Sequence, residues 1–183
     1  MQKIQNGSIL ISEPFLGDEN FERSVVLVCS HSAEGSFGLV LNRLSNLMLS
    51  DVLPVDEAVF DKELGIGGPM EHNTLHYLHQ LSDLPESIQL SEQVFWGGDF
   101  NELQDRIAEG QIAEEKIRFF LGYSGWDAGQ LEEEIEKNVW IINNQAIDKF
   151  FNLSPENLWR EILKRMGGKY KMLSNYPIDP SLN

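Results

Sequence analysis

The chain has 183 residues, of which 42% are hydrophobic and 23% charged, a balance typical of one folded domain rather than a disordered segment. Its formal net charge of −15 argues against direct binding to nucleic acid or to an anionic membrane, because both ligands require Lys and Arg. Its single cysteine, Cys29, excludes an intrachain disulfide, and no signal peptide or membrane-spanning run is visible, so a cytoplasmic location is expected.

The first half of the chain is predicted to consist mainly of short strands. Apolar and β-branched runs predict strands at residues 8–12, 24–30, 37–41, 64–66, 74–78, 87–90 and 93–96. The glycine-containing connection between the second and third of these predicts a hairpin. Residues 44–61, between the strands predicted at 37–41 and 64–66, look irregular. They are expected to contain a short helix that begins at Ser50 and is ended by Pro54.

Helices become frequent in the second half. Asp99 is expected to cap a helix that Gly110 ends, and a strand follows at residues 117–121. The glycine-rich stretch Gly122–Leu131 then predicts a tight turn from this strand into a helix that ends near Asn138. In this turn Asp127 is expected to be the capping residue, with Gln130 completing a capping box.

Three more elements complete the predicted fold. They are a strand at residues 139–142, a short helix at 144–151, and a helix from Ser154-Pro155 to Gly167. The elements together predict an α/β fold: one compact body with a mixed, largely antiparallel sheet of about eight or nine strands and about five helices. Residues 1–168 are expected to form this single domain, and residues 169–183 an extended C-terminal tail.

Several separated blocks of the sequence resemble one protein family. The blocks begin with Leu10, Pro14, Leu16, Asp18 and Phe21, and continue with His31, Gly35, Gly38–Arg43, Gly67–Pro69, Arg118, Gly122–Ile135 and Trp140. From about Gly7 to Gly167 they are similar to the bacterial AlgH/YqgE family. The resemblance implies a compact α/β fold and a cytoplasmic bacterial protein. It implies little chemistry, since the family is largely uncharacterised and some members are only labelled transcriptional regulators.

Two residues depart from the family pattern. Position 44 is leucine where the family usually has proline, and position 124 is serine where it usually has alanine. Ser124 lies between a predicted strand and a predicted helix, which is the setting of a nucleophile elbow. However, Trp126 occupies the place of the second glycine of that motif, and a family that accepts alanine at position 124 does not depend on a hydroxyl. A structural role is therefore favoured over a serine hydrolase.

The sequence disfavours two kinds of ligand site. The glycines at 122, 125 and 129 could cradle a phosphate at a helix N-terminus, but they match no nucleotide-binding fingerprint, and the acidic residues 132–134 follow them. His72, His76 and His79 would share one face of a helix, as metal ligands do. The alternation at residues 74–78 instead predicts a strand, which places His76 and His79 on opposite faces. No metal site and no cofactor are expected.

One candidate site remains, at the point where the glycine-rich blocks could converge. The hypothesis is a pocket with Trp126 as an apolar wall and polar contacts from Asn42 and Arg43; its residues are Asn42, Arg43, Gly67, Gly68, Pro69, Gly122, Gly125, Trp126 and Gln130. The alternative is that these blocks only pack the fold.

The favoured function is a non-catalytic binding or regulatory module that acts through a protein partner or a small ligand. No catalytic residue is assigned, and an enzyme is the less favoured reading. An undiscovered enzyme using the same pocket, and a transcriptional regulator by family label, stay open as alternatives; the net charge disfavours direct DNA binding.

Overall fold

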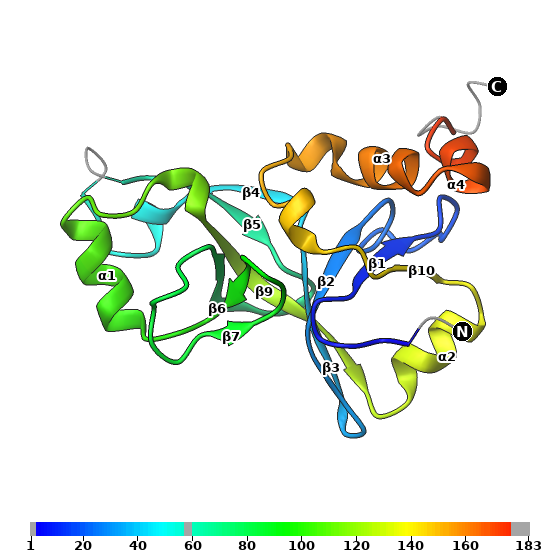
Figure 1. Ribbon diagram of the computed structural model, residues 1–183, viewed down its shortest axis with the longest axis horizontal. Helices are drawn as coiled ribbons and strands as arrows, with labels where there is room; N and C mark the ends of the chain where they lie inside the picture. The colour runs from blue at the N-terminus through cyan, green and yellow to red at the C-terminus, as the bar shows by residue number, and fades with distance from the viewer. Residues whose placement is uncertain (1–2, 57–59, 177–183) are drawn as a thin grey trace.

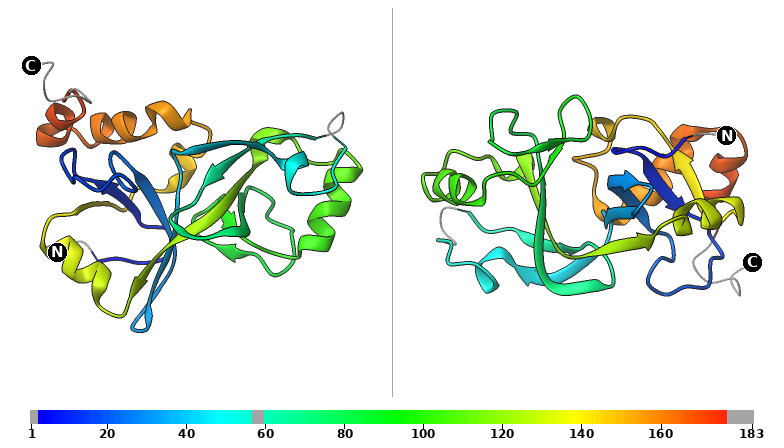
Figure 2. Two further views of the ribbon diagram at one scale, coloured as in Figure 1. Left: turned by 180° about the vertical axis from the view of Figure 1, so that it is seen from behind. Right: turned by 90° about the horizontal axis from the view of Figure 1, so that it is seen from below.

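A single long strand, β9 (Ile117–Asp127), runs between two lobes of the protein (Figure 1). The computed structural model describes residues 3–56 and 60–176. One lobe holds most of the chain from about residue 44 to the start of β9, including α1 (Phe100–Ala108), and the other holds the remaining elements and both ends of the described chain (Figures 1 and 2). No helix in the described ranges is long and apolar enough to cross a membrane.

The sheet has ten strands in the described part of the chain. They are β1 (Ile9–Ser12), β2 (Val25–Ser32), β3 (Gly35–Val40), β4 (Leu44–Met48), β5 (Glu63–Ile66), β6 (Met70–His79), β7 (Ile88–Gln89), β8 (Phe95–Trp96), β9 and β10 (Trp140–Asn143). Their order is β10-β1-β2-β3-β9-β6-β8-β7, with β5 pairing both β4 and β9. All pairs are antiparallel except β5 with β9. The predicted mixed, largely antiparallel sheet is therefore confirmed.

Four α-helices occur in the described ranges: α1 (Phe100–Ala108), α2 (Gln130–Glu136), α3 (Pro155–Met166) and α4 (Gly168–Leu173). Short 3-10 turns lie at Leu49–Asp51, Glu114–Lys116 and Ile147–Lys149. Asp99 caps α1 as predicted, because its Oδ1 accepts hydrogen bonds from the backbone N–H groups of Asn101 and Glu102.

The helices close three hydrophobic cores. One face of the sheet formed by β1, β2 and β3 packs against α3, with Leu27, Leu39 and Ile162 fully buried between them. The opposite face packs against α2 through Leu10, Val26 and Leu131. In the other lobe, α1 covers the sheet with Leu103 and Ile107 against residues such as Phe119 and Tyr77. Successive residues of β9 thus serve different cores, since side chains alternate along a strand.

The stretch Gly122–Leu131 differs from the prediction. The strand does not end at Leu121 but continues through Asp127, and only residues 128–129 form the turn into α2. Gly129, with φ of 78°, is the N-cap residue in place of Asp127. Gln130 does reach back as expected, since its Oε1 accepts a hydrogen bond from the Asp127 backbone N–H.

Three further differences concern elements near turns. Residues 44–48 form strand β4, although an irregular stretch was predicted, because Ser45 and Asn46 interrupt the apolar residues of this strand and Asn46 has a φ of 61°. Gly168–Leu173 forms helix α4 where an extended tail was expected. Finally, only a 3-10 turn at Ile147–Lys149 forms where a short helix over residues 144–151 was predicted.

The extended form of β9 follows from a close contact between glycines. A Cβ atom on Gly67 would lie 2.3 Å from the carbonyl oxygen of Gly122, and one on Gly68 would lie 2.3 Å from the carbonyl of Tyr123. Gly122 itself has φ of 67°, and a Cβ there would lie 2.6 Å from the carbonyl oxygen of Met70. The chain between β5 and β6 therefore crosses β9 with backbone against backbone, which only glycine permits.

We predict that Gly67→Ala lowers the free energy of unfolding by about 1–3 kcal/mol or more, because the added methyl group meets backbone that cannot move aside. Gly125→Ala, on the same strand β9, is the matched control, since its Cβ would meet only the side chain of Tyr123 at 3.2 Å. Urea unfolding of both variants measures the difference. Equal losses in the two variants would contradict the close crossing.

Candidate functional site

Asn42 and Arg43, the two polar residues at the strand end in the predicted pocket, form hydrogen bonds to nearby backbone and line neither of the two hollows described below. The Asn42 side chain accepts a hydrogen bond from the Val25 N–H and donates one to the carbonyl of Arg23, both at 2.8 Å. Arg43 Nη2 donates to the carbonyls of Glu19 and Glu22, at 3.0 and 3.1 Å. Both side chains thus hold the loop between β1 and β2 against the end of β3.

Trp126 and Gln130 belong to a network centred on Glu134 of α2. Glu134 Oε2 accepts hydrogen bonds from the indole N–H of Trp126 at 2.8 Å and of Trp140 at 2.7 Å. Its Oε1 accepts from Gln130 Nε2 at 2.9 Å. The two indole rings also meet edge to face, with 6.0 Å between their centres. One carboxylate therefore ties α2 to β9 and to β10.

The structure brings together some residues of the predicted pocket, but through packing. Gly67, Gly68 and Gly122 meet at the backbone crossing, with Pro69 half-buried next to them. Gly125 is exposed on the far half of β9. The two hollows described below are lined by other residues, none of them from the predicted set. The contacts of the predicted residues agree with the packing alternative.

A groove of about 860 Å³ lies beside β10, and we call it the edge groove. In Figure 1, β10 lies between α4 and α2 at one side of the molecule. The apolar and aromatic lining comes from the N-terminal segment, α2, β10, α4 and the short stretch after α4. The residues are Ile4, Ile135, Trp140, Ile141, Ile142, Tyr170, Met172, Leu173 and Tyr176. Its volume is in the range of ligand-binding sites.

The groove also contains the open edge of the sheet. Among the described strands, β10 pairs only with β1. The N–H of Glu13 donates to the carbonyl of Val139, so the register directs the backbone groups of Ile141 and Asn143 toward β1. The backbone N–H and C=O groups of Trp140 and Ile142 consequently point away from β1. An edge of this kind is a template for another strand.

Charged side chains surround the apolar lining. Three carboxylates, from Glu13, Glu132 and Glu136, line the groove together with the amines of Lys3 and Lys169. His31 also lines it, with its Nδ1 2.8 Å from Ser36 Oγ and its Nε2 3.6 Å from Glu132 Oε1. The groove thus has apolar walls bordered by three carboxylates, two amines and one imidazole.

Ser124 is not placed as a nucleophile. The residue is fully buried, and its hydroxyl donates to the carbonyl oxygen of Gly67 at 3.1 Å. It therefore belongs to the glycine crossing, where a hydrogen bond holds the two chain segments together.

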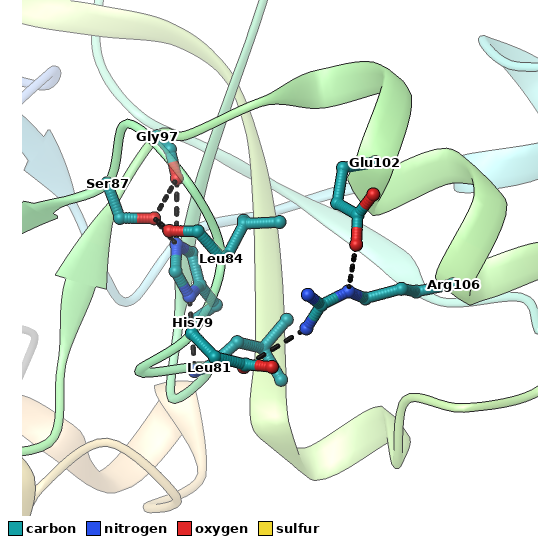
Figure 3. Close-up of polar contacts among 8 residues, drawn as sticks. His79, Leu81, Leu84, Ser87, Gly97, Glu102 and Arg106 are labelled. Atoms are coloured by element: carbon teal, nitrogen blue, oxygen red, sulfur yellow. Dashed lines mark hydrogen bonds and ion pairs between the residues drawn. The ribbon is translucent and has the colours of Figure 1, made fainter.

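A second serine, Ser87, lies near a buried histidine in the other lobe (Figure 3). His79 Nε2 lies 2.7 Å from the carbonyl oxygen of Gly97, and its Nδ1 accepts from the Leu81 N–H at 3.2 Å. A carbonyl only accepts, so Nε2 carries the proton and cannot take one from Ser87, whose Oγ lies 3.2 Å away. Ser87 instead donates to the carbonyl of Leu84. The pair is a loop anchor, not a catalytic dyad.

The three histidines considered as metal ligands are dispersed. His76 contacts the rings of Phe37 and Tyr123, whereas His79 lies on the opposite face of β6, stacked on Phe95. His72 is exposed. No group of three or more His, Cys, Asp or Glu side chains within residues 3–56 and 60–176 is placed to hold a metal ion.

Sequence reasoning missed the residues that form the groove. Trp140 and Leu173 line the groove, and Glu134 holds Trp140; from the sequence, Glu134 and Trp140 were known only as parts of the family pattern within a helix and a strand, and Leu173 as part of a tail. The spacing of Trp126 and Gln130 from Glu134 was a usable signal, because one helix turn separates Gln130 from Glu134. The open edge of β10 had no local signal, since strand order depends on distant pairings.

Burial lowers the pKa of both His79 and His76. Their folded-state pKa values lie below the unfolded value of about 6.5, so the unfolded chain binds more protons once the pH falls below that value. Above pH 7 the contribution of these two histidines to the free energy of unfolding is constant. We predict that the free energy of unfolding decreases as the pH falls from about 6.5 toward the lowered pKa values.

The expected loss from His79 is roughly 1 kcal/mol between pH 7.5 and 5.5. Urea unfolding at the two pH values should show a smaller difference for His79→Gln, which retains a side-chain donor but does not titrate. His72→Gln is the control, because that side chain is exposed. An unchanged pH dependence in His79→Gln would contradict the role of burial.

Comparison with known proteins connects these features to a family. A UPF0301 protein of Cytophaga hutchinsonii is 46% identical over 182 residues, covering 98% of this chain and 100% of the relative. A UPF0301 protein of Bacteroides fragilis is 43% identical, covering 97% of this chain and 90% of the relative. The crystal structure of protein DIP2367 from Corynebacterium diphtheriae has the same fold, with a TM-score of 0.77 at 22% identity and coverage of 96% and 94%.

The solution structure of the AlgH protein from Pseudomonas aeruginosa is similar as well. It has a TM-score of 0.74 at 28% identity, and the match covers 97% of this chain and 98% of that one. The family model described as AlgH-like matches residues 9–171, which include all ten strands and α1, α2 and α3. The chain therefore belongs to the AlgH-like family.

Proposed function

We propose that this protein is a non-catalytic binding module and that the edge groove takes an extended segment of a partner protein. The observation that carries the proposal is the open edge of β10 inside a groove of about 860 Å³. An extended peptide is a ligand that can satisfy backbone groups and fill apolar pockets at the same time.

The backbone part of this recognition involves two residues. Trp140 and Ile142 direct their N–H and C=O groups outward. A peptide strand added beside β10 would therefore form up to four new backbone hydrogen bonds with these two residues. Trp140 is held in place by the Glu134 carboxylate. The edge is therefore already in its extended form before a partner arrives, which reduces the ordering cost of binding.

The side chains around the edge favour a partner with apolar and basic residues in alternation. Side chains of an added strand point alternately toward the two faces of the sheet. One face offers Ile135 of α2, and the other offers Leu173 and Met172 of α4. The side chain of Met172 is 66% exposed. Glu132 and Glu136 provide carboxylates next to these apolar surfaces, and the overall charge of −15 attracts a cationic segment.

Two observations support a binding rather than a catalytic role. The hydroxyl of Ser124 and the imidazole of His79 are both buried and used in internal hydrogen bonds. A regulatory role through a protein partner also requires no contact with DNA, which fits the acidic composition.

We predict that a synthetic peptide of alternating isoleucine and lysine binds the wild-type protein and that charge reversal in the groove weakens binding at least about tenfold, since two attractive pairs become repulsive. The test variant is Glu132→Lys with Glu136→Lys. The control, Asp105→Lys with Glu109→Lys, makes the same change in net charge at exposed positions on and just after α1, in the other lobe. Fluorescence anisotropy of the labelled peptide gives the affinities.

The backbone pairing is tested with the same peptide. N-methylation of the residues on its pairing edge should abolish binding, whereas N-methylation on the outer edge should not. In the NMR spectrum of the complex, the amides of Trp140 and Ile142 should shift. Equal weakening by the two charge-reversed variants, or unshifted Trp140 and Ile142 amides, would contradict the proposal.

A further inference from the structure

A second hollow, of about 350 Å³, lies where the two lobes meet, and we call it the junction cavity. The start of β9, the residues before β5 and the N-terminal end of α3 surround it; these elements approach one another in Figure 1. The lining residues that matter here are Lys62, Arg118, Phe119, Phe151, Ser154 and Pro155.

Two cationic side chains face this cavity without a carboxylate partner. Arg118 Nη2 donates to the carbonyl oxygen of Leu41 at 2.5 Å, and its guanidinium lies over the ring of Phe120 at 5.3 Å. Lys62 Nζ donates to the carbonyls of Ile117, at 2.8 Å, and of Glu114. Neither cation forms an ion pair with an acidic side chain in the described part of the chain.

The environment is unfavourable for both positive charges as they stand. Burial lowers the pKa of Arg118 to about 10. The pKa of Lys62 is lowered by burial and, to a smaller extent, by the nearby charge of Arg118. Two like charges in a partly closed hollow repel each other, so an anion between them would relieve an existing cost.

The end of α3 adds to the positive potential. Ser154 is the N-cap residue of this twelve-residue helix, but its hydroxyl makes no capping hydrogen bond, and Pro155 occupies the first turn. Pro155 has no N–H, and the N–H of Asn157 donates to the carbonyl of Ser154 at 3.1 Å, so the helix end contributes the positive end of its dipole rather than a row of free donors. Arg118 has five N–H donors, of which one is used by Leu41.

Two carboxylates, from Glu63 and Glu115, also line the cavity, but neither neutralises the two cations. Glu63 Oε1 accepts a hydrogen bond from the backbone N–H of Asn46, at 3.2 Å. Glu115 is exposed, and among the groups that shift the pKa of Lys62 its individual effect is smaller than that of burial or of Arg118. Neither Glu63 nor Glu115 pairs with the two cations.

We propose that the junction cavity binds the phosphoryl group of a small organic phosphate. A phosphate dianion matches two cations and a helix N-terminus, and a guanidinium suits bidentate contact with its oxygens. The walls formed by Phe119, Phe151 and Leu153 would accommodate an apolar or aromatic remainder of the ligand. The site is separate from the edge groove, so its failure would leave the proposed function untouched.

The test uses phenyl phosphate as the probe, with calorimetry at low ionic strength and NMR mapping on the full chain. We expect saturable binding at pH 7.5 that weakens at pH 5.5, as the phosphate becomes a monoanion. The amides of Phe119 and Ser154 should shift. Lys62→Met should reduce the affinity at least tenfold, whereas Lys116→Met, an exposed lysine two residues before Arg118, should not.

Two further probes establish which chemistry is recognised. Benzoate should bind at least tenfold more weakly than phenyl phosphate, and inorganic phosphate should compete with phenyl phosphate for the site. Equal binding of benzoate and phenyl phosphate would overturn the assignment to a phosphoryl group. No binding, or equal binding by the Lys62→Met and Lys116→Met variants, would overturn the site. Arg118→Lys, checked for folding by circular dichroism, should bind more weakly than the wild type.

Discussion

The rest of the structure depends on the contact between two backbones at Gly67-Gly68 and Gly122. A Cβ on Gly67 would lie 2.3 Å from the Gly122 carbonyl oxygen, which is far inside any tolerated distance. This contact lets β9 pass from one lobe into the other as a single strand that pairs β5 and β6 with its first half and β3 with its second. The two lobes consequently share one rigid element, and features at its two ends keep a fixed separation.

One proposed site includes the start of β9, and the other is supported from its far end. At its start, Arg118 lies in the junction cavity under the N-terminal end of α3. At its far end, Trp126 binds the Glu134 carboxylate, which also holds Trp140 on the edge strand β10. The residues that carry the family resemblance therefore act mainly as supports. Asn42 and Arg43 hold a loop, the glycines allow the crossing, and Glu134 positions the strand that borders the edge groove.

The sequence predicted local elements well and tertiary placement poorly, for physical reasons. The hairpin of β2 and β3 and the cap at Asp99 depend on neighbouring residues, so local patterns suffice. Gly122 was taken for a turn because clustered glycines usually mark one, whereas here its positive φ lies within a strand and accommodates a second chain segment. Strand β4 was missed because Ser45 and Asn46 interrupt its apolar residues, and α4 because Gly167-Gly168 normally ends a helix. The edge groove and the junction cavity combine residues more than 100 positions apart, which no local pattern encodes.

Amide hydrogen exchange measured residue by residue tests the central claim, a rigid β9 with an open sheet edge at β10. The account predicts alternation along β10: slow exchange for Ile141 and Asn143, which bond to β1, and fast exchange for Trp140 and Ile142, which face outward. Amides of β9 near Gly122 should exchange only through global unfolding. Slow exchange at all four β10 positions would show that the edge is covered, and local opening of β9 at Gly122 would show that the two lobes are not rigidly joined.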